Sequence, residues 1–169
     1  MKTKYYTGIG SRETPENIRE IIHLISIKLE KQGYTLRSGG ANGADTFFEE
    51  KVVKKDIFIP WKNFNGVVGG IIPSTSEKSL DLIRTVHPVF DKLTEGARKL
   101  HLRNINQVLG HNLDDPSSFL ICWANVDNKG IPKGGTRTAW CLATLYKIPC
   151  FNLFFEKDLY RFKKYIYEE

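Results

Sequence analysis

The sequence has little that would indicate a membrane protein, a disulfide-stabilised protein or a metalloprotein. It contains 3 cysteines and 4 histidines among 169 residues, and their spacing fits neither a disulfide framework nor a metal-ligand set. No apolar run approaches the roughly 18 residues that cross a bilayer, and the first residues lead directly into strand-like sequence without a signal peptide. We therefore expect reduced thiols, no metal, no membrane contact and a cytoplasmic location.

The composition also lacks the extremes that mark disordered, collagen-like or coiled-coil chains. Hydrophobic residues make up 41% and charged residues 26%, which is close to ordinary globular usage. This length predicts one domain over 1–169. The 25 Lys+Arg exceed the 19 Asp+Glu by 6, and this surplus fits either an anionic partner or simple solubility.

Short β-prone runs alternate with helical segments along the chain. This order predicts an α/β fold with a Rossmann-like, doubly wound and mostly parallel sheet. An irregular insertion is expected near 61–88, where glycine, proline and serine are frequent. The expected strands cover 4–8, 34–38, 56–60, 117–124 and 148–154. The expected helices cover 15–32, 45–54, part of 94–109, 137–146 and 156–169.

The first helix has clear boundaries in the sequence. Thr14 is expected to cap it and Pro15 to occupy its first position. Gly33 is expected to end it. An apolar stripe predicts which face is buried, and it comprises Ile18, Ile22, Ile25 and Leu29.

Three glycine-rich turns each follow an expected strand and open an expected helix. They are 8–13, 39–45 and 130–136. The carboxyl ends of parallel strands share one edge, so the turns should meet at a common crevice. Glycine lets the backbone approach a ligand closely, and helix N-termini favour phosphate. The pattern therefore predicts a phosphate-bearing ligand.

The same turns lack the standard nucleotide-binding motifs. No turn contains a Walker A sequence. Gly8-Ile9-Gly10 begins a dinucleotide-binding pattern, but Glu13 stands where the third glycine would be. ATP hydrolysis and NAD redox chemistry are thus disfavoured.

Four ordered motifs together resemble a known family. They are Gly10-Ser11-Arg12, Ser38-Gly39-Gly40-Ala41-Asn42-Gly43-Ala44-Asp45, Leu102-Arg103-Asn104-Ile105-Asn106 and Gly134-Gly135-Thr136-Arg137-Thr138-Ala139. Their order resembles the Rossmann-like core of the DNA-processing protein A (DprA/Smf) family. More broadly, it is similar to the SLOG superfamily, which joins DprA to the LOG nucleotide hydrolases. The resemblance covers most of 4–154 and implies a nucleotide or nucleic-acid ligand.

The resemblance also implies which residues bind the ligand. Asp45 would accept from a ribose hydroxyl or cap its helix, and Arg12 would contact phosphate or pair with Glu13 or Glu16. Replacing Arg12 or Arg103 by alanine should weaken binding with little loss of stability. Thr136 and Thr138 would hold an anion or cap the following helix. The implied ligand-binding residues are Gly10, Ser11, Arg12, Ser38, Gly39, Gly40, Asn42, Asp45, Arg103, Asn104, Gly134, Gly135, Thr136 and Thr138.

One departure from the LOG hydrolases concerns catalysis. Those enzymes carry a glutamate in the helix after the third turn, whereas here no Asp or Glu lies between Gly130 and Phe155. Cleavage of an N-glycosidic bond needs a carboxylate, so this turn is suited to holding a ligand. Asp45 or Glu49 could substitute. No catalytic residue and no cofactor are assigned.

These observations predict capture of a nucleotide-derived small molecule without turnover. The ligand would be an ADP-ribose-type or cyclic signal, and analogy implies a sensor or sequestering protein in phage or antiviral defence. Two alternatives remain open: DprA-like binding of single-stranded DNA, and an N-glycosidase acting on a nucleoside monophosphate. Self-association is expected through Leu159, Phe162 and Ile166, unless that face packs on the chain's own sheet.

Overall fold

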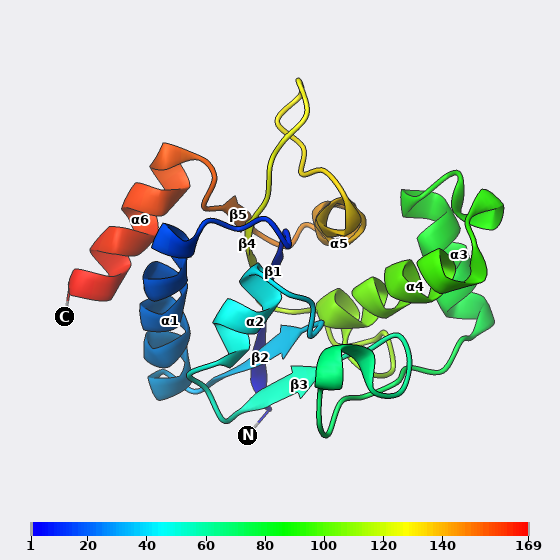
Figure 1. The fold of residues 1–169 in the computed structure, drawn as a ribbon, viewed down its shortest axis with the longest axis horizontal. Helices are drawn as coiled ribbons and strands as arrows, with labels where there is room; N and C mark the ends of the chain where they lie inside the picture. Colours follow the sequence, from blue (N-terminus) through cyan, green and yellow to red (C-terminus); the bar gives the residue numbers. More distant parts are fainter. Residues whose placement is uncertain (1, 169) are drawn as a thin grey trace.

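The computed structural model describes residues 2–168, which form an α/β fold around one parallel sheet (Figure 1). The strands are β1 (Lys4–Gly10), β2 (Tyr34–Ser38), β3 (Lys55–Ile57), β4 (Leu120–Trp123) and β5 (Cys150–Asn152). The α-helices are α1 (Glu16–Lys31), α2 (Ala44–Glu49), α3 (Glu77–Val86), α4 (Glu95–Leu109), α5 (Gly135–Leu145) and α6 (Glu156–Tyr167). Short 3₁₀ turns lie at η1 (Phe64–Gly66) and η2 (Phe90–Lys92).

The strand order is β3-β2-β1-β4-β5, and every pairing is parallel. Helices α1, α2 and α6 cover one face, while α4 and α5 cover the other and α3 packs outside them (Figure 1). Side chains alternate along β1. Tyr6 therefore packs in the core between the sheet and α1, α2 and α6, and Ile9 packs in the core between the sheet and α4 and α5. The predicted Rossmann-like, doubly wound fold is confirmed.

The first helix follows the sequence prediction on its buried face and at its end. The four residues of the apolar stripe are buried, and Gly33 adopts the left-handed φ of 91°. The predicted cap is wrong. Helix α1 begins at Glu16 with Pro15 as N-cap, because the Thr14 hydroxyl instead donates to the Ser11 carbonyl at 2.6 Å.

Two segments differ from their predicted form. The expected insertion at 61–88 contains helix α3, whose start is fixed by reciprocal hydrogen bonds between Ser76 and Ser79 and whose Ile83 is buried. Helix α2 ends at Glu49 and does not reach 54. The amides of Val53 and Lys54 donate to Glu30 on α1, which draws the chain away from the helix axis.

The C-terminal helix packs against its own chain. Phe162 lies in the core 5.4 Å from the Phe151 ring, and Leu159 and Ile166 pack against the same cluster. The apolar face expected to drive self-association is therefore occupied by α1 and β5. Among residues 2–168, no helix is both long and apolar enough to cross a membrane.

Candidate functional site

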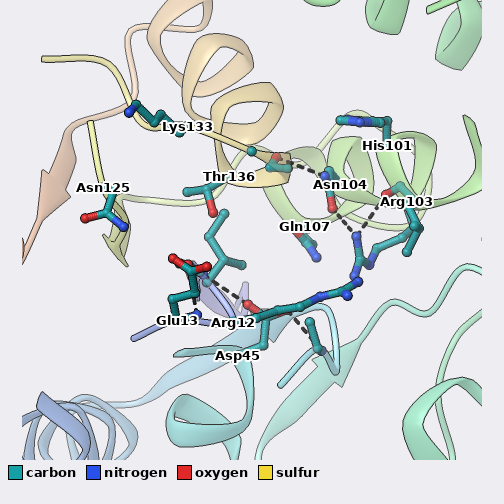
Figure 2. A pocket seen from close by; sticks show the side chains of 17 residues that line it. Arg12, Glu13, Asp45, His101, Arg103, Asn104, Gln107, Asn125, Lys133 and Thr136 are labelled. Carbon is teal, nitrogen blue, oxygen red and sulfur yellow. Dashed lines mark hydrogen bonds between the residues drawn. The ribbon is translucent and has the colours of Figure 1, made fainter. Parts of the chain in front are cut away.

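A cavity of about 470 Å³ lies over the carboxyl ends of β1 and β4, between α4 and α5 (Figure 2). Its walls come from the turn after β1, one face of α4, the base of the 125–133 loop and the first turn of α5. Such a position, beyond the carboxyl edge of a parallel sheet, is where α/β folds bind ligands.

The cavity brings together most of the residues that the resemblance implied. Nine of them line it: Gly10, Ser11, Arg12, Asp45, Arg103, Asn104, Gly134, Gly135 and Thr136. The rest lie elsewhere. Gly40 and Asn42 line a separate cavity of about 590 Å³ beside 65–69. Ser38 is fully buried, and its hydroxyl has no partner among the described residues.

Asp45 ties together the turns that follow β1 and β2. Its Oδ1 accepts from the Gly10 amide at 3.1 Å and its Oδ2 from the Ala41 amide at 3.3 Å. It does not cap α2, whose N-cap is Gly43 without a side-chain hydrogen bond. Burial raises the pKa of Asp45 to about 6, against the opposing effects of the Arg103 charge and the two amides.

Arg103 is buried in the wall formed by α4. Its Nε donates to the Phe58 carbonyl at 3.1 Å, and its two Nη atoms donate to the carbonyls of Leu100 at 2.8 Å and Gly39 at 3.2 Å. It also donates to the side chain of Asn104. Burial lowers the pKa of this guanidinium, while the charge of Asp45 opposes that effect. Arg103 therefore holds backbone segments together as well as bordering the cavity.

Gly39 leaves the space that this buried group requires. A Cβ at that position would lie 2.1 Å from Gln107 Nε2, 2.8 Å from Asp45 Oδ2 and 2.9 Å from Arg103 Nε. Gly39 is thus a packing residue under the cavity wall. Its missing side chain leaves room for Gln107, Asp45 and Arg103, and its carbonyl accepts a hydrogen bond from Arg103.

Arg12 and Lys133 form the cationic rim of the cavity. Both side chains are exposed, and neither forms an ion pair with a residue in 2–168. The alternative pairing of Arg12 with Glu16 is wrong, since Glu16 bonds Arg19 at 2.9 Å. In Figure 2, Arg12 extends toward Arg103, and its charge contributes to the lowered pKa of that residue.

The start of α5 is open toward the cavity. Its N-cap is Gly134, with φ of 70°, and no side chain caps this end. Neither Thr136 nor Thr138 therefore acts as the cap. Thr136 lines the cavity, whereas Thr138 lies behind it, where its hydroxyl is 2.8 Å from His101 Nδ1. Uncapped amides and the helix dipole favour an anion here.

Sequence reasoning missed three residues of α4 that line the cavity: Leu100, His101 and Gln107. Leu100 and Gln107 lie on the same helical face as the predicted Arg103 and Asn104, and His101 lies three residues before Asn104. That spacing, counted outward from the motif, could have found them. Burial lowers the pKa of His101 to about 4, and the neighbouring charges of His87 and Arg103 add to this effect.

The loop before α5 contributes two further residues, Asn125 and Lys133. Asp127 fixes this loop: its Oδ1 accepts from the amides of Lys129 and Ile131, and its Oδ2 pairs with Arg137 at 2.9 Å. These bonds lower the pKa of Asp127 to about 2, the Ile131 amide having the largest effect. Within the described part of the chain, no cluster of three His, Cys, Asp or Glu side chains could hold a metal ion.

A search of solved structures finds the fold in DNA processing protein A from Helicobacter pylori, a protein described for its single-stranded DNA binding mode. The TM-score is 0.56 at 20% sequence identity, and the alignment covers 89% of this chain and 65% of that chain. No family model and no curated protein matches the sequence. The likeness establishes a DprA-like Rossmann fold.

Proposed function

We propose that this protein binds a phosphate-bearing, nucleotide-derived small molecule in the cavity over β1 and β4, and releases it unchanged. The observation that carries the proposal is the meeting of Arg12 and Arg103 at one side of the cavity. Neither guanidinium is bonded to a carboxylate of residues 2–168. Asp45 lies near Arg103 but bonds to backbone amides, so a bound anion would stabilise the two facing guanidinium groups.

A second anionic group would lie at the start of α5. Its uncapped N-terminus and the exposed Lys133 border the same cavity. Backbone amides at a helix N-terminus accept phosphate without sequence-specific side chains. The volume of about 470 Å³ is in the range of small-molecule sites, so a nucleotide would fit within it.

The absence of turnover rests on the carboxylates of the cavity. Among the described residues, Asp45 and Glu13 are those that line it. Both Asp45 oxygens already accept backbone amides, and Glu13 is exposed at the rim. Glu49, the other substitute, lies outside the cavity with its carboxylate 3.7 Å from Lys55. A site without a free inner carboxylate suits sensing or sequestration of a nucleotide signal.

Mass spectrometry of the purified protein tests the proposal. Mild heating should release a phosphate-bearing small molecule whose mass is the same before and after incubation with the protein. Arg12→Ala should lower affinity for that molecule by about tenfold or more, because a charge-assisted hydrogen bond is lost. Lys99→Ala removes the same charge outside the cavity and should bind as wild type does. Release of a free base would instead indicate an N-glycosidase.

Single-stranded DNA is the second candidate, because the structurally similar DNA processing protein A binds it. In that case an oligonucleotide would bind with an affinity that falls steeply with added salt, and mononucleotides would not compete. Competition by a mononucleotide at constant salt would favour the small-molecule site.

A further inference from the structure

The inner end of the cavity is formed by a buried side chain that sequence reasoning did not identify. Gln107 is 2% exposed, yet its side-chain amide forms no hydrogen bond with another residue in 2–168. Figure 2 shows this side chain pointing from α4 toward the cavity. The amide is not sealed in the core but opens onto the cavity, so its donors and acceptor are free for a bound ligand.

The position of Gln107 is fixed from both sides. Its backbone carbonyl accepts from the Thr7 hydroxyl at 2.6 Å and the Ser117 hydroxyl at 3.4 Å, which joins the last turn of α4 to β1. Its Nε2 lies against Gly39, at a point where even a Cβ would be only 2.1 Å away. The amide is therefore held in one place before a ligand arrives, and preorganisation of this kind favours selective binding.

The surroundings of Gln107 suit a neutral planar group better than a phosphate. Gln107 Nε2, Asp45 Oδ2 and Arg103 Nε surround the same point over Gly39, and the Asp45 carboxylate disfavours a phosphate there. Elsewhere in the cavity, Ile9, Ala41 and Leu100 contribute apolar surface. The nearby Arg103 already donates to carbonyl oxygens and to Asn104, so it acts on the phosphate near Arg12 through its charge. A primary amide offers two donors and one acceptor, and this combination matches the edge of a nucleobase.

We infer that Gln107 is a specificity-determining residue that hydrogen-bonds the edge of a nucleobase, with the phosphate lying toward Arg12 at the rim. This inference rests on the proposed function. It narrows the ligand class to nucleotides that carry a base, and it excludes sugar phosphates and inorganic diphosphate. Adjacent donors and acceptors on the base would satisfy the amide in one of its two flipped orientations.

Isothermal titration with defined probes tests the inference. The probes are the four ribonucleoside 5′-monophosphates and ribose 5-phosphate, which carries the same phosphate and sugar without a base. Wild type should bind its best monophosphate about tenfold or more tightly than ribose 5-phosphate. Gln107→Met keeps the side-chain length and removes the amide, so it should bring the monophosphate down to the affinity of ribose 5-phosphate. Its affinity for ribose 5-phosphate should stay within about twofold, a result that a structural role would not give.

The other outcomes overturn the inference alone or the inference together with the proposed function. Equal weakening of both probes in Gln107→Met would give Gln107 a general structural role and overturn the inference, as would unchanged binding of the monophosphate. Binding of ribose 5-phosphate as tightly as every monophosphate in wild type would also overturn it, while leaving the phosphate site intact. If neither probe binds wild type, the proposed function and the inference fail together. Thermal unfolding of Gln107→Met identifies any loss of fold.

Discussion

The two sides of the cavity use their charged residues differently. On the inner wall, Asp45 accepts two backbone amides and Arg103 donates to three backbone carbonyls. On the rim, Arg12 and Lys133 are exposed and form no ion pair within residues 2–168. The inner charges hold strand-end turns in position, while the rim charges remain available to a ligand. A charged residue at a ligand cavity can thus be part of the fold, part of the site, or both.

The difference between wall and rim changes the stability expected for the alanine variants of Arg12 and Arg103. Sequence reasoning treated Arg12 and Arg103 alike, with weaker binding and little loss of stability for either alanine variant. The hydrogen bonds of Arg103 make a loss of stability the expected result at that position. The expectation for Arg12 is unchanged.

The largest effect is expected at Gly10, where the inner wall meets the sheet. A Cβ there would lie 2.3 Å from the Trp123 carbonyl oxygen and 2.7 Å from the Ala44 Cβ, so β1 and β4 would have to separate. Gly10→Ala should lower the free energy of unfolding by more than about 3 kcal/mol, measured by urea denaturation. Gly96→Ala is the matched control, since nothing lies within 4 Å of its Cβ. It should stabilise α4 by about 0.5–1 kcal/mol. Similar behaviour of the two variants would contradict a tightly packed inner wall.

The next effect separates Arg103 from Arg12. Arg103→Ala leaves the carbonyls of Phe58 and Gly39 unpaired and removes the cation beside buried Asp45, so the free energy of unfolding should fall by about 3 kcal/mol. Arg12→Ala should stay within about 0.5 kcal/mol of wild type, as should Lys99→Ala. An equal loss in Arg12→Ala and Arg103→Ala would remove the distinction between wall and rim.

A smaller effect concerns the pH dependence of stability. The pKa of Asp45 rises from 3.8 in the unfolded chain to about 6 in the folded one. The folded state therefore binds more protons between these values, so this group favours folding at low pH and loses that contribution as pH rises through 6. Relative to Asp45→Asn, the free energy of unfolding of wild type, measured by urea denaturation, should fall by about 2–3 kcal/mol between pH 4 and pH 7.

His101 should change the free energy of unfolding with pH in the opposite direction. Its pKa falls from 6.5 to about 4, so the unfolded state binds more protons and stability rises with pH over this window. Relative to His101→Asn, wild type should gain stability between pH 4 and pH 7. A slope of the same sign for both variant pairs would mean that one of these groups is more solvated than its burial indicates.

The sheet could be predicted from the sequence because its signals are local. The stripe from Ile18 to Leu29 and the apolar run of 120–123 each specify an element, and parallel topology follows from their alternation with helices. Helix α3 was missed because its start depends on a Ser76–Ser79 capping pair rather than on a Glu or Gln at the third position.

The candidate site was predicted only in part because its assembly depends on tertiary contacts. The position of strand ends brings Gly10, Arg12 and Gly134 to one cavity, which topology alone predicts. Whether a charge is bonded elsewhere is not encoded locally. Arg103 reaches the carbonyls of Phe58 and Gly39, 45 and 64 residues away in the chain.

The smallest effect tests the loop that carries Lys133 on the rim. Asp127→Asn keeps an oxygen that accepts the amides of Lys129 and Ile131, and loses the charge that pairs with half-exposed Arg137. Exposed ion pairs contribute little, so the thermal midpoint should stay within about 2 °C of wild type at physiological salt. Because the pKa of Asp127 is about 2, the result should be the same at pH 4 and pH 7. Asp127→Ala also removes the acceptor and should speed hydrogen exchange at the Ile131 amide. A loss in Asp127→Asn as large as that in Arg103→Ala would show that the rim is built as rigidly as the inner wall.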